Sequence, residues 1–145
     1  LLLGGLGIAE ALAPLLAAAR HRLLVLVPYV HREATAVGTL LGPMRGLAQA
    51  GGDVRLLLGQ PPAAHQGLTG GVLGLPVAVM DPLRCTTGHA KGVVADDVAV
   101  VGSANWSGAG LGANREAALV LHSTAVADYF AAAFEHDWAT ARPLP

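Results

Sequence analysis

Reactive side chains stand close together near the middle of this sequence. His89 and Lys91 are separated by one residue at the start of an apolar run that ends at Ala95. Side chains alternate along a strand, so if His89 opens a strand, both side chains project to the same side. An imidazole can attack phosphorus or transfer a proton, while an ammonium offsets charge on the non-bridging oxygens of a phosphate diester. The pair therefore indicates phosphodiester cleavage, in which neither step requires a metal ion.

Three further polar residues follow at positions from which they could reach the same site. Ser103 and Asn105 come directly after a second apolar run, Val98 to Val101. The serine hydroxyl, the asparagine amide and exposed backbone N–H groups can all donate to phosphate oxygens. Glu116 begins a third apolar run and could accept a hydrogen bond from one ring nitrogen of His89, which would fix the tautomer. A histidine held in this way is a better nucleophile.

Asp96 lies between the first two runs. Asp96-Asp97 is a tight-turn sequence, and the apolar runs on either side of it predict a hairpin. In such a turn Asp96 would point away from His89, so a structural role in a salt bridge or in the turn is as plausible as direct catalysis. Both roles stay open, and Asp96 is kept among the candidate catalytic residues.

The order of these residues resembles the HKD motif of the phospholipase D superfamily. The resemblance covers most of the chain and extends to Val25-Leu26-Val27-Pro28-Tyr29, Asn114-x-Glu116 and Phe134-x-x-Asp137-Trp138. His-x-Lys alone occurs by chance in many chains. Asp96, Gly102-Ser103-x-Asn105 and Glu116 in the same order make coincidence a poor explanation.

The resemblance implies a phospholipase D-type phosphodiesterase, a hydrolase that uses no cofactor and no metal. His89 would form a covalent phosphohistidine. Lys91 and Asn105 would hold phosphate oxygens, Ser103 would support them, and Glu116 would orient His89. The expected substrate is a phospholipid or a related diester, which is hydrolysed or transferred to another alcohol. A nuclease acting on DNA or RNA is the alternative.

The His-x-Lys unit occurs only once in this sequence. Diester cleavage needs one group to attack and another to protonate the leaving oxygen, so we expect a second HKD-containing half. That half would come from the same longer chain or from a second copy in a homodimer, about a two-fold or pseudo-two-fold axis. The first residue is a leucine inside an apolar stretch, which favours the second half of a two-motif protein. A non-catalytic half that completes a partner's site is the remaining alternative.

The elements around the motif predict an α/β fold. Residues 8–20 and 33–50 read as helices, the second interrupted at Gly42-Pro43, and 23–27 and 54–58 read as buried strands. A helix between two fully apolar strands is typical of a right-handed βαβ unit in a parallel sheet. We therefore expect a mixed, mostly parallel sheet with helices on both faces, as in phospholipase D-like folds.

The rest of the chain continues this pattern. Residues 76–80 and 116–121 read as further strands, after a loop over 60–74. Ser123 or Thr124 can cap a last helix, in which an aromatic stripe containing Phe130, Phe134 and Trp138 is interpreted as core packing.

Length and composition bound the function classes. The 145 residues suit one domain, and 53% of them are hydrophobic, which excludes a disordered chain. Cys85 is the only cysteine, and the Cys/His pairs of a zinc site are absent from the sequence. A net charge of −1 is not the basic excess of a protein that binds nucleic acid through phosphates alone, which favours a lipid or small diester. No targeting or membrane segment is evident, so the cytoplasm is the default compartment.

Several other residues have less specific interpretations. The remaining histidines are interpreted as surface or hydrogen-bonded residues: His21, His31, His65, His122 and His136. His31 follows a predicted parallel strand at the edge where α/β sheets bind ligands, so it is also kept as a substrate contact. Trp106 is expected to pack under the Asn105 turn, and 108–112 is expected to be a flexible connection.

Overall fold

The computed structural model describes residues 2–5, 7–60 and 70–145. His65 and most of the expected 60–74 loop lie outside these described residues. The elements are, in chain order, β1 (Leu2–Gly5), α1 (Ile8–Ala18), β2 (Arg22–Val27), α2 (Thr35–Gln49), β3 (Asp53–Leu58), α3 (Gly70–Leu73), β4 (Val77–Val79), β5 (Gly92–Ala95), β6 (Val98–Gly102), the π-helical turn η2 (Ala109–Ala113), β7 (Glu116–His122), α4 (Thr124–Trp138) and β8 (Arg142–Pro143).

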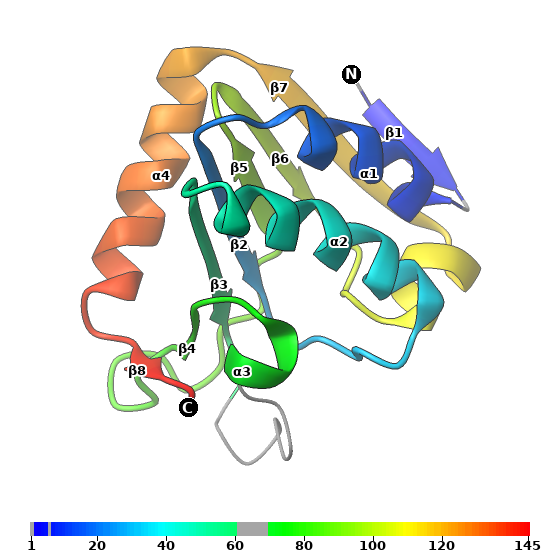
Figure 1. Cartoon of the computed structure of the whole chain (residues 1–145). Helices are drawn as coiled ribbons and strands as arrows, with labels where there is room; N and C mark the ends of the chain where they lie inside the picture. Colours follow the sequence, from blue (N-terminus) through cyan, green and yellow to red (C-terminus); the bar gives the residue numbers. More distant parts are fainter. Residues whose placement is uncertain (1, 6, 61–69) are drawn as a thin grey trace.

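The described strands form one sheet in the order β1-β7-β6-β5-β2-β3-β4-β8 (Figure 1). The pairs β2–β3 and β3–β4 are parallel. The other five pairs are antiparallel. The α/β class and the parallel β2-α2-β3 unit are confirmed, but the prediction of a mostly parallel sheet is wrong. The turn between β5 and β6 is too short for a crossover helix, so these strands must run antiparallel.

Helices cover both faces of the sheet, as predicted. In Figure 1, α1 and α2 lie over one face and α4 lies against the other. Alternate residues of β2 enter the two cores: Leu23, Val25 and Val27 pack with α1 and α2, while Leu24 packs with α4. Burial on both faces explains why β2 is a continuous apolar run without polar alternation.

Helix α2 is continuous through Pro43, so the predicted interruption at Gly42-Pro43 is wrong. Val37, Leu40, Leu41 and Met44 are fully buried along one side of this helix. Packing of that face outweighs the local cost of glycine and proline, because most helical stability in proteins comes from tertiary burial.

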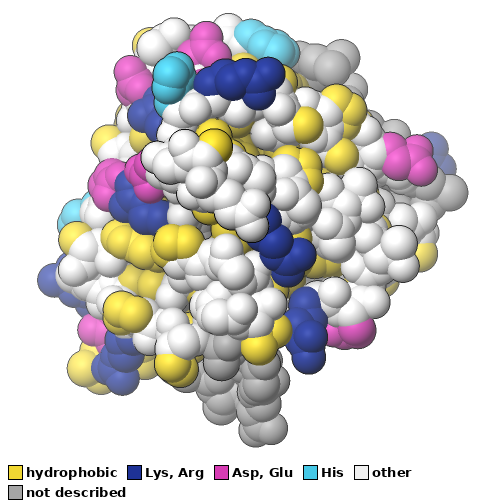
Figure 2. Space-filling model, in the orientation of Figure 1, with side chains coloured by type: hydrophobic (Ala, Val, Ile, Leu, Met, Phe, Trp, Pro, Cys, Tyr) yellow, Lys and Arg dark blue, Asp and Glu magenta, His cyan; other side chains and the backbone are white. Residues whose placement is uncertain are grey.

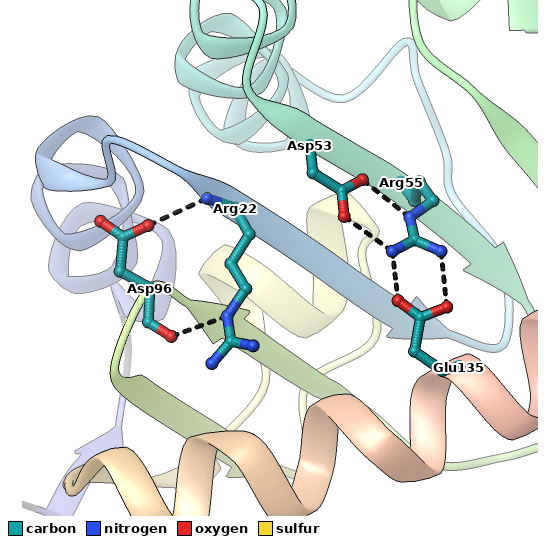
Figure 3. Close-up of polar contacts among 5 residues, drawn as sticks. All are labelled: Arg22, Asp53, Arg55, Asp96 and Glu135. Carbon is teal, nitrogen blue, oxygen red and sulfur yellow. Dashed lines mark hydrogen bonds and ion pairs between the residues drawn. The ribbon is translucent and has the colours of Figure 1, made fainter.

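Helix α4 is held by a cap at its start and by Arg55 near its end. Ser123 Oγ accepts from Val126 N–H at 3.5 Å, as expected of an N-cap residue. The Arg55 guanidinium bonds Asp53 and Glu135 (Figure 3) and lies over the rings of Phe134 and Trp138, 5.6 and 5.4 Å from their centroids. The side-chain bonds to Glu135 and Asp53 raise the pKa of Arg55. Core packing of the aromatic stripe is confirmed: Phe134 is buried, and the half-buried Phe130 and Trp138 pack against the same cluster.

Charged side chains of both signs are interspersed over the face in view in Figure 2, without an extended stretch of one sign. Among the described residues, no helix combines the length and the apolar character that a bilayer crossing requires.

Candidate active site

His89 and Lys91 lie in the extended segment before β5, and the strand itself begins at Gly92. Lys91 Nζ is 2.7 Å from His89 Nδ1 and 3.3 Å from Nε2. The same ammonium donates to the His89 carbonyl at 2.6 Å. The two side chains therefore converge on one place, although neither residue belongs to the strand. His89 is exposed, so its ring is accessible.

A close contact between two glycines holds the segment that carries His89. Gly88 N–H donates to Gly59 O at 2.7 Å, directly after β3. A Cβ on Gly59 would lie 2.1 Å from Gly88 O, so only glycine fits this approach. The histidine is thus attached to the end of β3, two strands away in the sheet, as well as to β5.

Strands β6 and β7 bring the next polar residues to the same end of the sheet. Gly102 N–H donates to Lys91 O at 3.2 Å. Ser103 pairs with Ala117 twice, through its N–H to the carbonyl at 3.0 Å and through its Oγ, which accepts from Ala117 N–H at 3.1 Å. Ser103 Oγ also donates to Glu116 Oε2. Antiparallel neighbours therefore place Lys91, Ser103 and Glu116 on adjoining chain segments.

The charges of Lys91 and Glu116 influence each other. Burial lowers the pKa of Lys91, and the Glu116 carboxylate opposes this shift. Hydrogen bonds from Ser103 and Asn114 lower the pKa of Glu116, and the Lys91 cation adds to that effect. The result is an ammonium and a carboxylate in one site, with Asn114 Nδ2 bound to Glu116 Oε1 at 3.0 Å.

Asn105 lies in a tightly packed turn after Ser103. Its Oδ1 is buried and has no hydrogen-bond partner among the described residues. A buried acceptor without a partner costs about 1–3 kcal/mol, which a bound water molecule or ligand would offset. A Cβ on Gly110 would lie 2.3 Å from Asn105 O, so this turn packs directly on η2. The expectation of a flexible connection over 108–112 is therefore wrong.

Asp96 lies at the opposite end of β5, in the hairpin turn. Its carboxylate accepts from the backbone N–H groups of Arg20, His21 and Arg22 at 2.7, 2.9 and 2.9 Å, and Arg22 Nε donates to Asp96 O at 3.0 Å (Figure 3). Partial burial opposes ionisation, but these backbone donors lower the pKa of Asp96. Five strand steps separate it from Lys91, about 16 Å. The structure does not bring Asp96 to the other candidates.

A sequence model described as "Cardiolipin synthase, PLD-like domain" matches residues 12–138. The chain belongs to the phospholipase D-like family. Among curated proteins, none matches this chain.

Solved structures agree with this fold. The phospholipase D family member Nuc from Salmonella typhimurium superposes with a TM-score of 0.76 at 15% identity, over 99% of this chain and 98% of that one. NucT from Helicobacter pylori gives 0.74 at 17%, over 99% and 100%. Phosphatidylserine synthase from Haemophilus influenzae Rd KW20 gives 0.69 at 17%, over 99% of this chain but 39% of that one. At these identities the likeness concerns the fold.

The phospholipase D-like site differs from the expected arrangement in one contact. Glu116 was expected to accept a hydrogen bond from His89, but its oxygens bond Ser103 and Asn114 instead. The sequence offers one signal for the Asn114 contact, its position two residues before Glu116 in an Asn-x-Glu unit.

Of the remaining residues singled out in the sequence, His31 and Trp106 lie beside the Asn105 turn, and the other described histidines are exposed. His31 N–H donates to Trp106 O at 2.8 Å, next to Asn105. Trp106 is 2% exposed and packs under the turn as predicted. His21, His122 and His136 are exposed, and among the described residues no three His, Cys, Asp or Glu side chains are grouped to hold a metal ion.

Proposed function

We propose that this chain cleaves phosphodiesters by nucleophilic attack of His89 on phosphorus. The observation that carries the proposal is the 2.7 Å contact between Lys91 Nζ and His89 Nδ1, beside the hydrogen-bonded Ser103 and Glu116. An exposed imidazole, an ammonium and neutral donors at one sheet end suit a phosphate with two substituents. Membership of the phospholipase D-like family supports the same reaction.

The proposed reaction has two steps. A ring nitrogen of His89 forms a bond to phosphorus while the bond from phosphorus to the leaving oxygen breaks, and the leaving alkoxide takes a proton from an acid. Water or an alcohol then attacks the phosphohistidine and gives its proton to the group that acted as the acid, while the nitrogen–phosphorus bond breaks. Lys91 has three N–H donors, so a bound phosphate can draw the ammonium away from Nδ1 and free the ring. Asn105 and Ser103 would add donors to the phosphate oxygens.

The proposed reaction needs an acid that protonates the leaving oxygen, and this sequence contains no second His-x-Lys unit to provide it. His89 is exposed at the end of the sheet, where a second half could meet it. We propose that this half supplies the second histidine, from a longer chain or from a second copy. If the second half supplied all the chemistry, this chain would be a non-catalytic completion domain, and replacing its histidine would leave the rate unchanged.

Turnover of bis-p-nitrophenyl phosphate by the assembly that contains both halves, with a chelator present, tests the proposal. We expect His89→Asn to lower kcat/KM by on the order of 10³-fold or more, because the nucleophile is removed. His136→Asn, an exposed histidine on α4, is the matched control and should keep full activity. Intact mass of a quenched sample should show a phosphoryl adduct that His89→Asn lacks. Equal rates for the two variants would contradict the proposal.

A further inference from the structure

A pair of aromatic rings in contact borders the candidate site and has no part in the proposed reaction. The rings of Tyr29 and His31 have centroids 4.8 Å apart and planes inclined by 30°. Tyr29 is half-buried and His31 is exposed. The pair therefore combines an anchored ring with an accessible one.

Backbone contacts hold this pair beside the Asn105 turn. His31 N–H donates to Trp106 O at 2.8 Å, and Ala34 N–H donates to His31 O at 3.0 Å. Val30, between the two rings, forms a parallel bridge with Trp106, the residue after Asn105. Both backbone polar groups of His31 are thus engaged, and the imidazole projects from a held backbone. A rigid support of this kind is what a recognition site needs.

Two arginines near this border are not used in ion pairs. Arg32 follows His31 and Arg115 precedes Glu116, and both arginines are exposed. No ion pair of the described residues includes either of them. Arg32 is therefore available for a phosphate that flanks the reacting one. The side chains of Asn114 and Glu116 meet, so that of Arg115, between them, points to the other side.

We infer that Tyr29 and His31 form a stacking platform for a nucleobase, so that the diester at His89 belongs to a single-stranded nucleic acid. The inference rests on the proposed function for the reaction itself. A pair of rings with polar edges, one of which is exposed, suits a flat heteroaromatic base better than a hydrocarbon chain. Only an unpaired base is free to stack on it. The net charge of −1 was an argument for a lipid substrate. It is a sum over the whole chain, however, and does not describe the local charge around Tyr29, His31 and Arg32.

Binding to two DNA probes tests the platform, with turnover removed by His89→Asn in every protein. Oligothymidylate and an abasic strand of equal length carry the same phosphates and differ only in their bases. We expect oligothymidylate to bind about 10-fold or more tightly by fluorescence anisotropy, because a stacked base strengthens binding by roughly 5- to 100-fold. Adding His31→Ala should reduce this preference to within about 2-fold, and His31→Phe should retain it. His122→Ala, an exposed histidine paired opposite Val98 at the far end of the sheet, should change neither affinity.

The outcomes separate the platform from the reaction. Equal binding of the two strands, or a base preference that survives His31→Ala, overturns the platform even if bis-p-nitrophenyl phosphate is cleaved. Binding to cardiolipin vesicles without binding of either strand overturns it in favour of a lipid. A His31-dependent base preference without any diester turnover supports the platform and rejects the proposed reaction.

Discussion

Lys91 is the residue that joins the His89 segment to the start of the β5–β6 pair. Its ammonium contacts the His89 ring and carbonyl, and its carbonyl accepts from Gly102. Burial lowers its pKa while Glu116 opposes that change. Lys91 therefore loses its proton at a lower pH than an ordinary lysine. The rate of any step that needs the ammonium should fall as the pH rises through this lowered pKa.

Replacing Lys91 with arginine should remove this alkaline dependence. A guanidinium stays protonated above pH 12, so kcat/KM for bis-p-nitrophenyl phosphate should no longer fall at high pH, although its planar shape should lower the maximum by about 10-fold or more. The measurement is a pH–rate profile of both proteins. An alkaline limb of the same midpoint in Lys91→Arg would show that another group is responsible.

The β5–β6 hairpin is the element that carries the His89 segment at one end and Asp96 at the other. Asp96 adopts a φ of 50°, a left-handed conformation that Asp and Asn tolerate better than most residues. From there its carboxylate joins the hairpin turn to the chain entering β2. We therefore propose a structural role for Asp96.

Asp96→Asn should lower the free energy of unfolding by about 1–3 kcal/mol at neutral pH, because an uncharged amide with one acceptor oxygen replaces an anion bound to three donors. The folded pKa of Asp96 is depressed, so its stabilisation is complete above the unfolded pKa and is lost as the pH falls through the folded value. The difference between the two proteins should accordingly shrink below about pH 4. Urea unfolding at several pH values measures this, with Asp97→Asn, an exposed neighbour, as the control. A large loss of kcat/KM at unchanged stability would instead favour a catalytic role.

At the scale of the whole molecule, the site lies open at one end of the sheet. In the reaction that we propose, a second half supplies the protonating group, which the exposed His89 and the single His-x-Lys unit support. A site completed by symmetry would sit on a two-fold axis between copies.

Activity per chain should therefore rise with chain concentration if a second copy completes the site. We expect kcat/KM to increase over the range in which sedimentation velocity shows dimers forming, because dimerisation follows mass action. If the second half belongs to a longer polypeptide, the chain alone should stay inactive at every concentration and gain activity when that half is added. Full activity from a stable monomer would contradict both versions.

Local sequence patterns determined much of this protein. Burial on both faces makes 23–27 and 54–58 apolar runs, and these runs are strands of the structure as predicted. Ser123 at the start of α4 and the tight turn at Asp96-Asp97 depend on neighbouring residues only, so they too could be predicted. The spacing of His89 and Lys91 likewise indicated the chemistry without any knowledge of the fold.

Tertiary structure decided which distant segments meet. Strand order places Trp106 against Val30, Asp96 against the backbone of 20–22, and Glu116 against Ser103 rather than His89. None of these pairings follows from spacing along the chain, because a short apolar run can pair in either direction with any neighbour. The packing of whole helices and strands selects among those arrangements. Tyr29 and His31 come to lie beside the Asn105 turn only through that packing.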